Sequence, residues 1–83
     1  MCYVYVLLDR NNKFYTGYTG NLKQRMEQHN NGGVRSTKNN RPLQLIYYEA
    51  CIDNKDALKR EKYLKSTWGK RYLTNRLKNY LTG

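Results

Sequence analysis

Apolar and polar positions follow two different periods along the chain, and the period predicts the type of each element. The run from Cys2 to Leu8 is apolar and aromatic, and it ends at the polar cluster 9–12, as is typical of a strand that enters a turn. Segment 13–19 has the same character, so these two segments predict a β-hairpin. Segment 43–50 has the apolar and aromatic composition of a third strand.

A first helix is expected between the second and third strands. The stretch 22–30 places apolar residues at helical spacing, and Asn21 before it is a suitable N-cap. Gly32 and Gly33 supply the left-handed stop that helices favour. The residues from there to Pro42 are mostly asparagine, glycine and basic residues with little to bury, which predicts an exposed basic loop.

Two further helices are expected after the third strand. Asp53 or Asn54 can cap the first of them, which extends to about Thr67, and Gly69 separates it from a helix over 70–81. The predicted order is β-β-α-β-α-α. This is a small α+β fold, in which helices flank a three-stranded sheet.

The net charge of the chain indicates a class of binding partner. Sixteen lysines and arginines stand against six acidic residues, and a net charge of +10 predicts a polyanionic partner, nucleic acid before a membrane surface. The apolar runs are far shorter than the ~20 residues of a membrane helix, and no secretory signal is recognisable. Two cysteines without metal-ligand spacing indicate reduced thiols. We therefore expect one cytoplasmic, nucleic-acid-binding domain over 1–83.

Glu61 is the clearest departure from an ordinary amphipathic pattern. On a helical wheel it falls in the middle of the apolar stripe of the second helix, which comprises Ala57, Leu58, Leu64 and Trp68. Burying a carboxylate without a partner costs roughly several kcal/mol. Two explanations stay open: a core glutamate paired with an arginine, or a carboxylate aimed at a site as a metal ligand or acid–base group.

The first helix carries two polar residues on its inward stripe. Arg25 and His29 are four residues apart and therefore neighbours one turn apart. Each taken alone has an ordinary interpretation, since an arginine stem can pack with its head in water and a lone histidine near a helix end is often a cap. With Glu61 they form a set: a fork for phosphate, a group that moves protons, and a ligand for Mg²⁺. Metal-assisted phosphodiester cleavage needs these three groups.

Two tyrosines and a glycine in the hairpin extend the candidate cluster. Tyr5 and Tyr15 are cross-strand neighbours if the register of the hairpin allows it, although tyrosine is common in strands for structural reasons. Gly17 lies inside the second strand, where glycine marks a bulge or a place where a ligand approaches the backbone closely.

These residues, in this order, resemble the GIY-YIG nuclease superfamily over essentially the whole chain. The chain is most similar to small stand-alone bacterial members that consist of the catalytic domain. The matching segments are Tyr3-Val4-Tyr5, Tyr15-Thr16-Gly17, Arg25 with His29, and Glu61 in Ala-Leu-Lys-Arg-Glu-Lys-Tyr-Leu-Lys. Tyr3 stands where the first signature has glycine, and Val4 and Thr16 stand where isoleucine is usual.

The resemblance implies a role for each matching position. Tyr5 and Tyr15 would point into the active site. Arg25 would bind the scissile phosphate, His29 would assist proton transfer, and Glu61 would be the single metal ligand, for Mg²⁺ or Mn²⁺. Which of Tyr5, Tyr15 and His29 acts as the general base stays open.

The expected activity is that of a metal-dependent endonuclease with DNA as substrate. The expected nucleic-acid contacts are Gly17, Arg35, Lys38, Arg41 and Asn75, of which Asn75 is similar to a late family asparagine that supports phosphate binding. Phosphate contacts position the backbone without reading bases, so we expect selection by shape rather than sequence. The family suggests DNA repair among its pathways, and a monomer or weak dimer is expected.

A binding protein without catalysis is the alternative. In a basic DNA- or RNA-binding module the tyrosines would stack on bases, and loss of Glu61 would be tolerated. A structural RNA-associated protein is a third interpretation, which predicts bound RNA and no chemistry. Metal-dependent turnover separates the nuclease from both.

Overall fold

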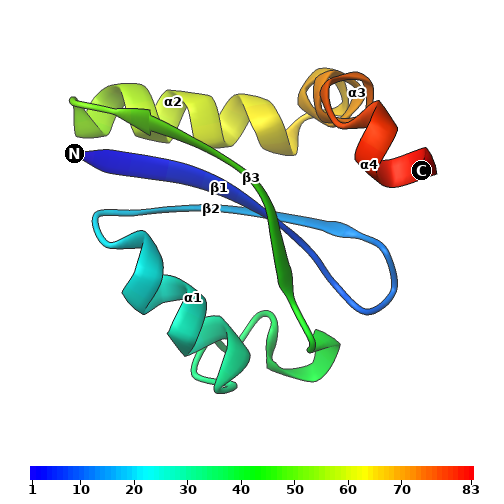
Figure 1. Ribbon diagram of the computed structural model, residues 1–83. Coiled ribbons are helices and arrows are strands. Elements are labelled where there is room, and N and C mark those ends of the chain that lie inside the picture. Colours follow the sequence, from blue (N-terminus) through cyan, green and yellow to red (C-terminus); the bar gives the residue numbers. More distant parts are fainter.

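The computed structural model describes residues 1–83 and has a three-stranded antiparallel sheet at its centre, in the order β2-β1-β3. The elements in chain order are β1 (Cys2–Leu8), β2 (Phe14–Thr19), α1 (Leu22–Asn30), the 3-10 helix η1 (Lys38–Asn40), β3 (Gln44–Cys51), α2 (Asn54–Lys65), α3 (Thr67–Arg76) and α4 (Lys78–Thr82). Helix α1 lies on one side of the sheet and α2 on the other (Figure 1). The predicted α+β class is confirmed. No helix here combines the length and apolar character that spanning a lipid bilayer requires.

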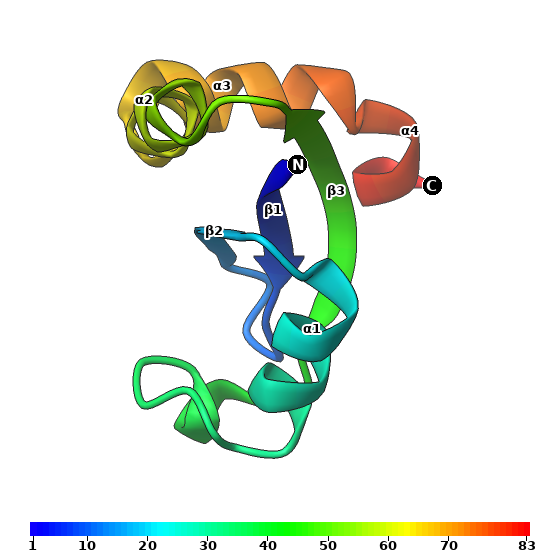
Figure 2. The same cartoon turned by 90° about the vertical axis from the view of Figure 1, so that its left-hand side faces the viewer.

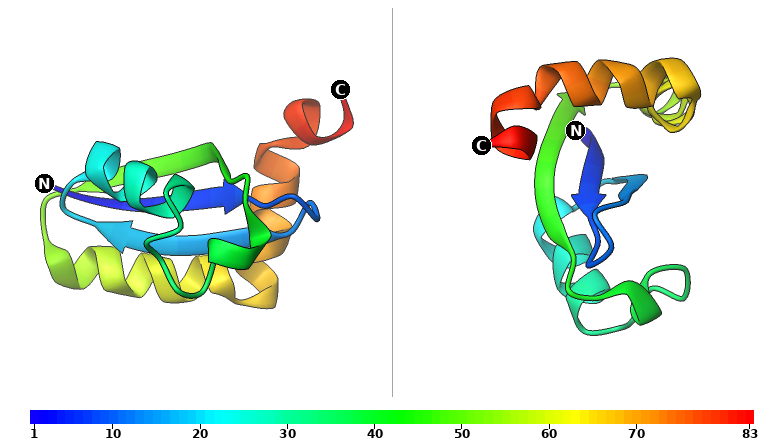
Figure 3. Two further views of the ribbon diagram at one scale, coloured as in Figure 1. Left: turned by 90° about the horizontal axis from the view of Figure 1, so that it is seen from below. Right: turned by 90° about the vertical axis from the view of Figure 1, so that its right-hand side faces the viewer.

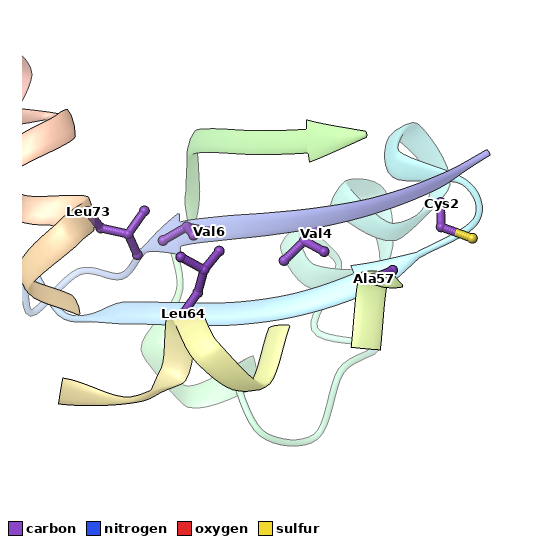
Figure 4. Close-up of a cluster of buried hydrophobic side chains, with 6 residues drawn as sticks. All are labelled: Cys2, Val4, Val6, Ala57, Leu64 and Leu73. Atoms are coloured by element: carbon purple, nitrogen blue, oxygen red, sulfur yellow. The ribbon is translucent and has the colours of Figure 1, made fainter. Parts of the chain in front are cut away.

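Strand β1 is the central strand and is buried on both faces, which explains its uninterrupted apolar run. One face packs beneath α2 and α3 in a cluster formed by Cys2, Val4, Val6, Ala57, Leu64 and Leu73 (Figure 4). The opposite face packs against α1 and β3 in a cluster of Tyr5, Leu7 and Leu43, with Tyr15, Leu22, Met26 and Leu45 around it. Strand β2 is left as an edge strand, as Figure 2 shows.

The hairpin turn and the helix caps form where the sequence predicts them. The Asp9 carboxylate accepts the backbone N–H of Asn11 at 2.7 Å, and Asn12 has a positive φ of 61°, which asparagine tolerates. The Asn21 side chain accepts the Gln24 N–H at 3.0 Å. Of the two candidate caps for α2, Asp53 is the one that acts.

The boundaries after α2 differ from the prediction. Gly69 does not separate two helices; it lies buried inside α3, and Ser66 ends α2 and caps α3 by accepting the Gly69 N–H at 3.1 Å. A Cβ at Gly69 would lie 2.0 Å from the Tyr63 carbonyl oxygen, so this glycine allows the two helices to meet at a close corner. The single helix expected over 70–81 is also interrupted, because Leu77 departs from helical geometry between α3 and α4.

Two burial expectations are wrong. The segment between α1 and β3 was expected to bury little, yet Val34 and Thr37 are buried in it. The apolar stripe of the second helix was expected to include Leu58 and Trp68, which are 45% and 67% exposed. The stripe is shorter because α2 ends at Lys65 and the chain turns a corner, so the helical wheel does not extend to Trp68.

Candidate active site

Strands β1 and β2 place two tyrosines on the face of the sheet that α1 covers. Tyr5 pairs with Gly17 and Leu7 pairs with Tyr15, so the tyrosines are diagonal rather than direct neighbours. Both rings contact the imidazole of His29 edge-on, with ring centroids 5.6 Å and 5.3 Å from it. The predicted pair of tyrosines therefore converges on one histidine.

Gly17 leaves free the space that the Tyr5 phenol occupies. A Cβ on Gly17 would lie 2.5 Å from the Tyr5 hydroxyl oxygen and 2.6 Å from Cζ of the same ring. Any side chain here would displace the phenol, because real Cβ contacts are not that short. The close approach to this glycine is thus made by the Tyr5 ring.

Helix α1 presents Arg25 and His29 to the Tyr5 hydroxyl. His29 is 0% exposed, and its Nε2 lies 2.8 Å from the Tyr5 oxygen. Arg25 Nε donates to the same oxygen at 3.3 Å. The predicted inward stripe of this helix is confirmed, and its two polar residues meet at one phenol.

The segment between α1 and β3 adds two hydroxyls that the sequence did not reveal. The Thr37 oxygen lies 2.8 Å from His29 Nδ1, and Ser36 donates to the Tyr15 hydroxyl at 3.3 Å. This segment leaves α1 as a wide loop before β3 begins (Figure 3). It has no hydrophobic period, and a threonine among polar residues gives no sequence signal of burial.

Burial sets the charge state of the two central groups. Burial, together with a smaller effect of the Arg25 charge in the same direction, lowers the pKa of His29 to about 4. Burial also raises the pKa of Tyr5, although the hydrogen bond and charge of Arg25 oppose that effect. At neutral pH His29 is therefore a neutral imidazole and Tyr5 a neutral phenol.

The Arg25 guanidinium has no acidic partner. Its two hydrogen bonds go to the neutral oxygens of Tyr5 and Gln28, at 3.3 Å and 3.1 Å, and the ion pairs of the protein lie elsewhere. A half-buried cation without a counter-ion attracts an anion, and the planar fork of arginine matches phosphate.

Glu61 on α2 lies close enough to Tyr5 for its negative charge to raise the pKa of that phenol. Its side chain is 18% exposed and pairs with Lys65 at 3.3 Å, which is the partner found in place of the arginine considered from the sequence. No group of three or more His, Cys, Asp or Glu side chains surrounds it. This donor set fits Mg²⁺, which retains several waters and needs one or two carboxylates plus substrate phosphate oxygens.

Of the other residues expected to contact nucleic acid, three lie on the segment between α1 and β3, and the fourth lies on α3. Arg35 and Lys38 are exposed on the segment after α1. Arg41 donates to the backbone carbonyl oxygens of Lys38 and Asn30, so its guanidinium also ties this segment to the end of α1. Asn75 is exposed on α3 and makes no hydrogen bond to the cluster.

Comparison with known proteins agrees with this geometry. Residues 1–75 match the model of the GIY-YIG catalytic domain. A UPF0213 protein of Clostridium perfringens is 41% identical over 66 residues, which cover 78% of this chain and 71% of the relative. A UPF0213 protein of Pediococcus acidilactici is 43% identical over 79 residues, covering 88% and 81%. The solution NMR structure of a UPF0213 protein from Bacillus halodurans has a TM-score of 0.58 at 30% identity, over 90% of this chain and 84% of that one. The chain belongs to the GIY-YIG family.

Proposed function

We propose that this protein is a metal-dependent endonuclease that hydrolyses phosphodiester bonds in DNA, with residues 1–83 as one nuclease domain. The observation that supports this most is Arg25, a half-buried cation without a counter-ion beside Tyr5. Neutral His29 hydrogen-bonds the same phenol, and the charge of the Glu61 carboxylate is near enough to raise the pKa of that phenol. In this proposal, Arg25 would bind phosphate, His29 and Tyr5 would transfer a proton, and Glu61 would bind the metal.

Glu61 is the residue that would hold the metal ion, Mg²⁺ or Mn²⁺. When bound, a divalent cation neutralises charge on the phosphate and on the departing oxygen. Lys65 would release the carboxylate at little cost, because the lysine side chain is 56% exposed and an ion pair with a solvated partner contributes only ~0–1 kcal/mol. Arg25 would hold a non-bridging oxygen of the scissile phosphate and stabilise the charge that develops on it.

The hydrogen bonds favour Tyr5 with His29 as the general base. Tyr5 would take a proton from the attacking water while it passes its own proton to His29 Nε2, 2.8 Å away. The water oxygen would then bond to phosphorus while the bond from phosphorus to the departing oxygen breaks, and the departing oxygen would take its proton from a solvent water. No free phenolate is needed, and the proton on His29 returns to solvent after product release.

Basic helices would supply the binding surface. Nine lysines and arginines stand against two acidic residues from residue 55 onward, namely Lys55, Lys59, Arg60, Lys62, Lys65, Lys70, Arg71, Arg76 and Lys78. Contacts of this kind bind phosphates of any sequence and weaken with salt. We therefore expect selection by nucleic-acid shape, with Arg35 and Lys38 near the cleaved bond and Asn75 at the edge of the surface.

Cleavage assays on four substrates test the proposal: labelled duplex DNA, single-stranded DNA, branched DNA and RNA, each with Mg²⁺, Mn²⁺ or a chelator. The wild type should cut at least one DNA form with metal only, and Glu61→Gln should lower the rate by about 10²-fold or more. Glu27→Gln removes an exposed carboxylate from α1 and is the matched control. Salt-sensitive binding with no cutting of any substrate would overturn the nuclease in favour of the non-catalytic binding module.

A further inference from the structure

The Thr37 side chain is buried against the one histidine of the protein. It is 2% exposed, in a segment that is otherwise largely exposed, and its oxygen lies 2.8 Å from His29 Nδ1. Thr37 lies too deep to meet a nucleic acid directly. Its hydroxyl acts on the site through His29.

Counting donors and acceptors shows which atom donates in each hydrogen bond from Arg25 through Tyr5 and His29 to Thr37. Arg25 can only donate, so the Tyr5 oxygen accepts from it and gives its single O–H to His29 Nε2. His29 Nδ1 must then carry the proton, which it donates to the Thr37 oxygen. The Thr37 O–H points on to the Val34 carbonyl oxygen at 3.5 Å, so every donor has an acceptor.

The opposite tautomer leaves a group unmatched. If His29 Nε2 carried the proton, the Tyr5 oxygen would face two donors, from His29 and Arg25, and its own O–H would have no acceptor among its bonded neighbours. A buried donor without an acceptor costs about 1–3 kcal/mol. That tautomer also has no lone pair on Nε2 to receive a proton from Tyr5.

The backbone around Thr37 holds its hydroxyl in place. The N–H groups of Thr37 and Lys38 both donate to the Val34 carbonyl, at 3.1 Å and 3.0 Å, and Asn40 N–H donates to the Thr37 carbonyl at 2.9 Å. Arg41 Nε closes the turn on the Lys38 carbonyl at 2.9 Å. The segment is thus organised before any substrate binds.

We propose that Thr37 is a positioning residue: it accepts the Nδ1–H that the Arg25 and Tyr5 hydrogen bonds impose on His29, and so holds the imidazole where Nε2 can accept the proton of Tyr5. The inference rests on the proposed function for its catalytic consequence. Its structural half, the tautomer of His29, is independent of whether the protein cuts nucleic acid.

The tautomer is measured directly by two-bond ¹H–¹⁵N correlation spectra of the imidazole at about neutral pH, where a protonated and an unprotonated nitrogen resonate far apart. The protein has one histidine, so the signals need no assignment. We expect a protonated Nδ1 and an unprotonated Nε2 in the wild type. Protonated Nε2 in the wild type would overturn the proposal without any variant.

Thr37→Val keeps the shape and removes the acceptor. It should leave the proton on Nδ1 but take away its hydrogen bond, which moves the Nδ1–H resonance, and lower kcat by about 10²-fold, with KM little changed because Thr37 does not touch substrate. Thr37→Ser should restore both readouts, and Thr74→Val, which removes an exposed hydroxyl on α3, should alter neither.

An Nδ1–H resonance at its wild-type position in Thr37→Val, or an unchanged kcat, would overturn the role. A wild type that shows the expected tautomer but cuts nothing would instead refute the proposed nuclease. If Thr37→Val does not fold, the wild-type spectrum and Thr37→Ser still decide the tautomer.

Discussion

Each face of the sheet carries a polar network built around one arginine, and the two arginines differ in their partners. On the α2 side, Arg60 forms a two-pronged ion pair with Glu49, with both distances 2.9 Å. On the α1 side, Arg25 meets only the neutral oxygens of Tyr5 and Gln28. One positive charge is matched within the protein, and the other is not.

The Arg60 network is closed on itself. Tyr47 donates to Glu49 at 2.7 Å, Tyr72 lies 3.1 Å from the Tyr47 oxygen, and the Arg60 guanidinium sits 5.2 Å and 5.0 Å from the rings of Tyr63 and Tyr72. Burial would raise the pKa of Glu49, but hydrogen bonds from Arg60 and Tyr47 outweigh burial and hold that pKa below its usual value. This network joins β3, α2 and α3.

The difference shows how to separate a structural arginine from one that awaits a ligand. Both side chains are partly buried and hydrogen-bonded, so burial alone does not distinguish them. The presence of a counter-ion distinguishes them, because a desolvated charge is stable only when an opposite charge offsets it. Arg60 has its carboxylate within the fold, whereas Arg25 has none, which supports the proposed role of Arg25 in binding phosphate.

The largest expected effect comes from removing one hydroxyl from each network. Tyr5→Phe deletes the link between Arg25 and His29, and we expect cleavage to fall by about 10²-fold or more. Tyr47→Phe deletes the bond to Glu49 and should lower stability by about 1 kcal/mol while leaving cleavage by the folded protein unchanged. Single-turnover rates and urea unfolding, measured on both variants, check this. Equal losses of cleavage would show that the two networks do not differ in function.

A second prediction is that protein stability depends on pH through the titration of the buried His29. The pKa of His29 is about 4 in the folded protein against 6.5 when unfolded, so the unfolded chain takes up a proton first as the pH falls. The contribution to stability should be fully present well above pH 6.5, should have declined by about 2 kcal/mol by about pH 5, and should be lost completely as the pH falls through about 4. Urea unfolding across this range measures it. His29→Gln removes the only histidine and should flatten the curve in that window; an unchanged slope would place the titration elsewhere.

An effect on stability somewhat smaller than that of the histidine titration is expected from Glu49→Gln. The substitution leaves Arg60 without its counter-ion, and we expect a loss of about 1–2 kcal/mol, since both side chains are partly exposed and solvent offsets part of the cost. Glu27→Gln is the matched surface control. Chemical denaturation measures the change, and a Glu49→Gln variant as stable as the wild type would mean that the Arg60 network contributes no net stability.

Much of the site was predictable because it lies on periodic elements. The helical period of α1 puts Arg25 and His29 on one face. Tyr5 and Tyr15 share a face only because of the register that the hairpin adopts, which the sequence left open. The caps Asn21 and Asp53 were predictable from side-chain chemistry. Each of these inferences depends on neighbours within a few residues along the chain.

The parts that could not be predicted depend on contacts between distant segments. Thr37 is buried because His29 needs a partner for Nδ1, and no local pattern around Thr37 shows this. Gly69 resembles a helix break in sequence, but its lack of a side chain serves the close corner between α2 and α3. The spacing of Trp68 continues the apolar stripe of α2 in the sequence. In the structure α2 ends at Lys65, so Trp68 does not lie on that stripe.

The most direct test of the account compares Arg25→Lys with Arg60→Lys, because both keep the charge and lose the planar fork. Metal-dependent DNA cleavage and the free energy of unfolding are measured for each. We expect Arg25→Lys to lose about 10²-fold or more in rate with stability retained, and Arg60→Lys to lose stability with the rate of the folded protein retained. Cleavage that survives Arg25→Lys unchanged would contradict the assignment of Arg25 to the substrate phosphate, and with it the central claim.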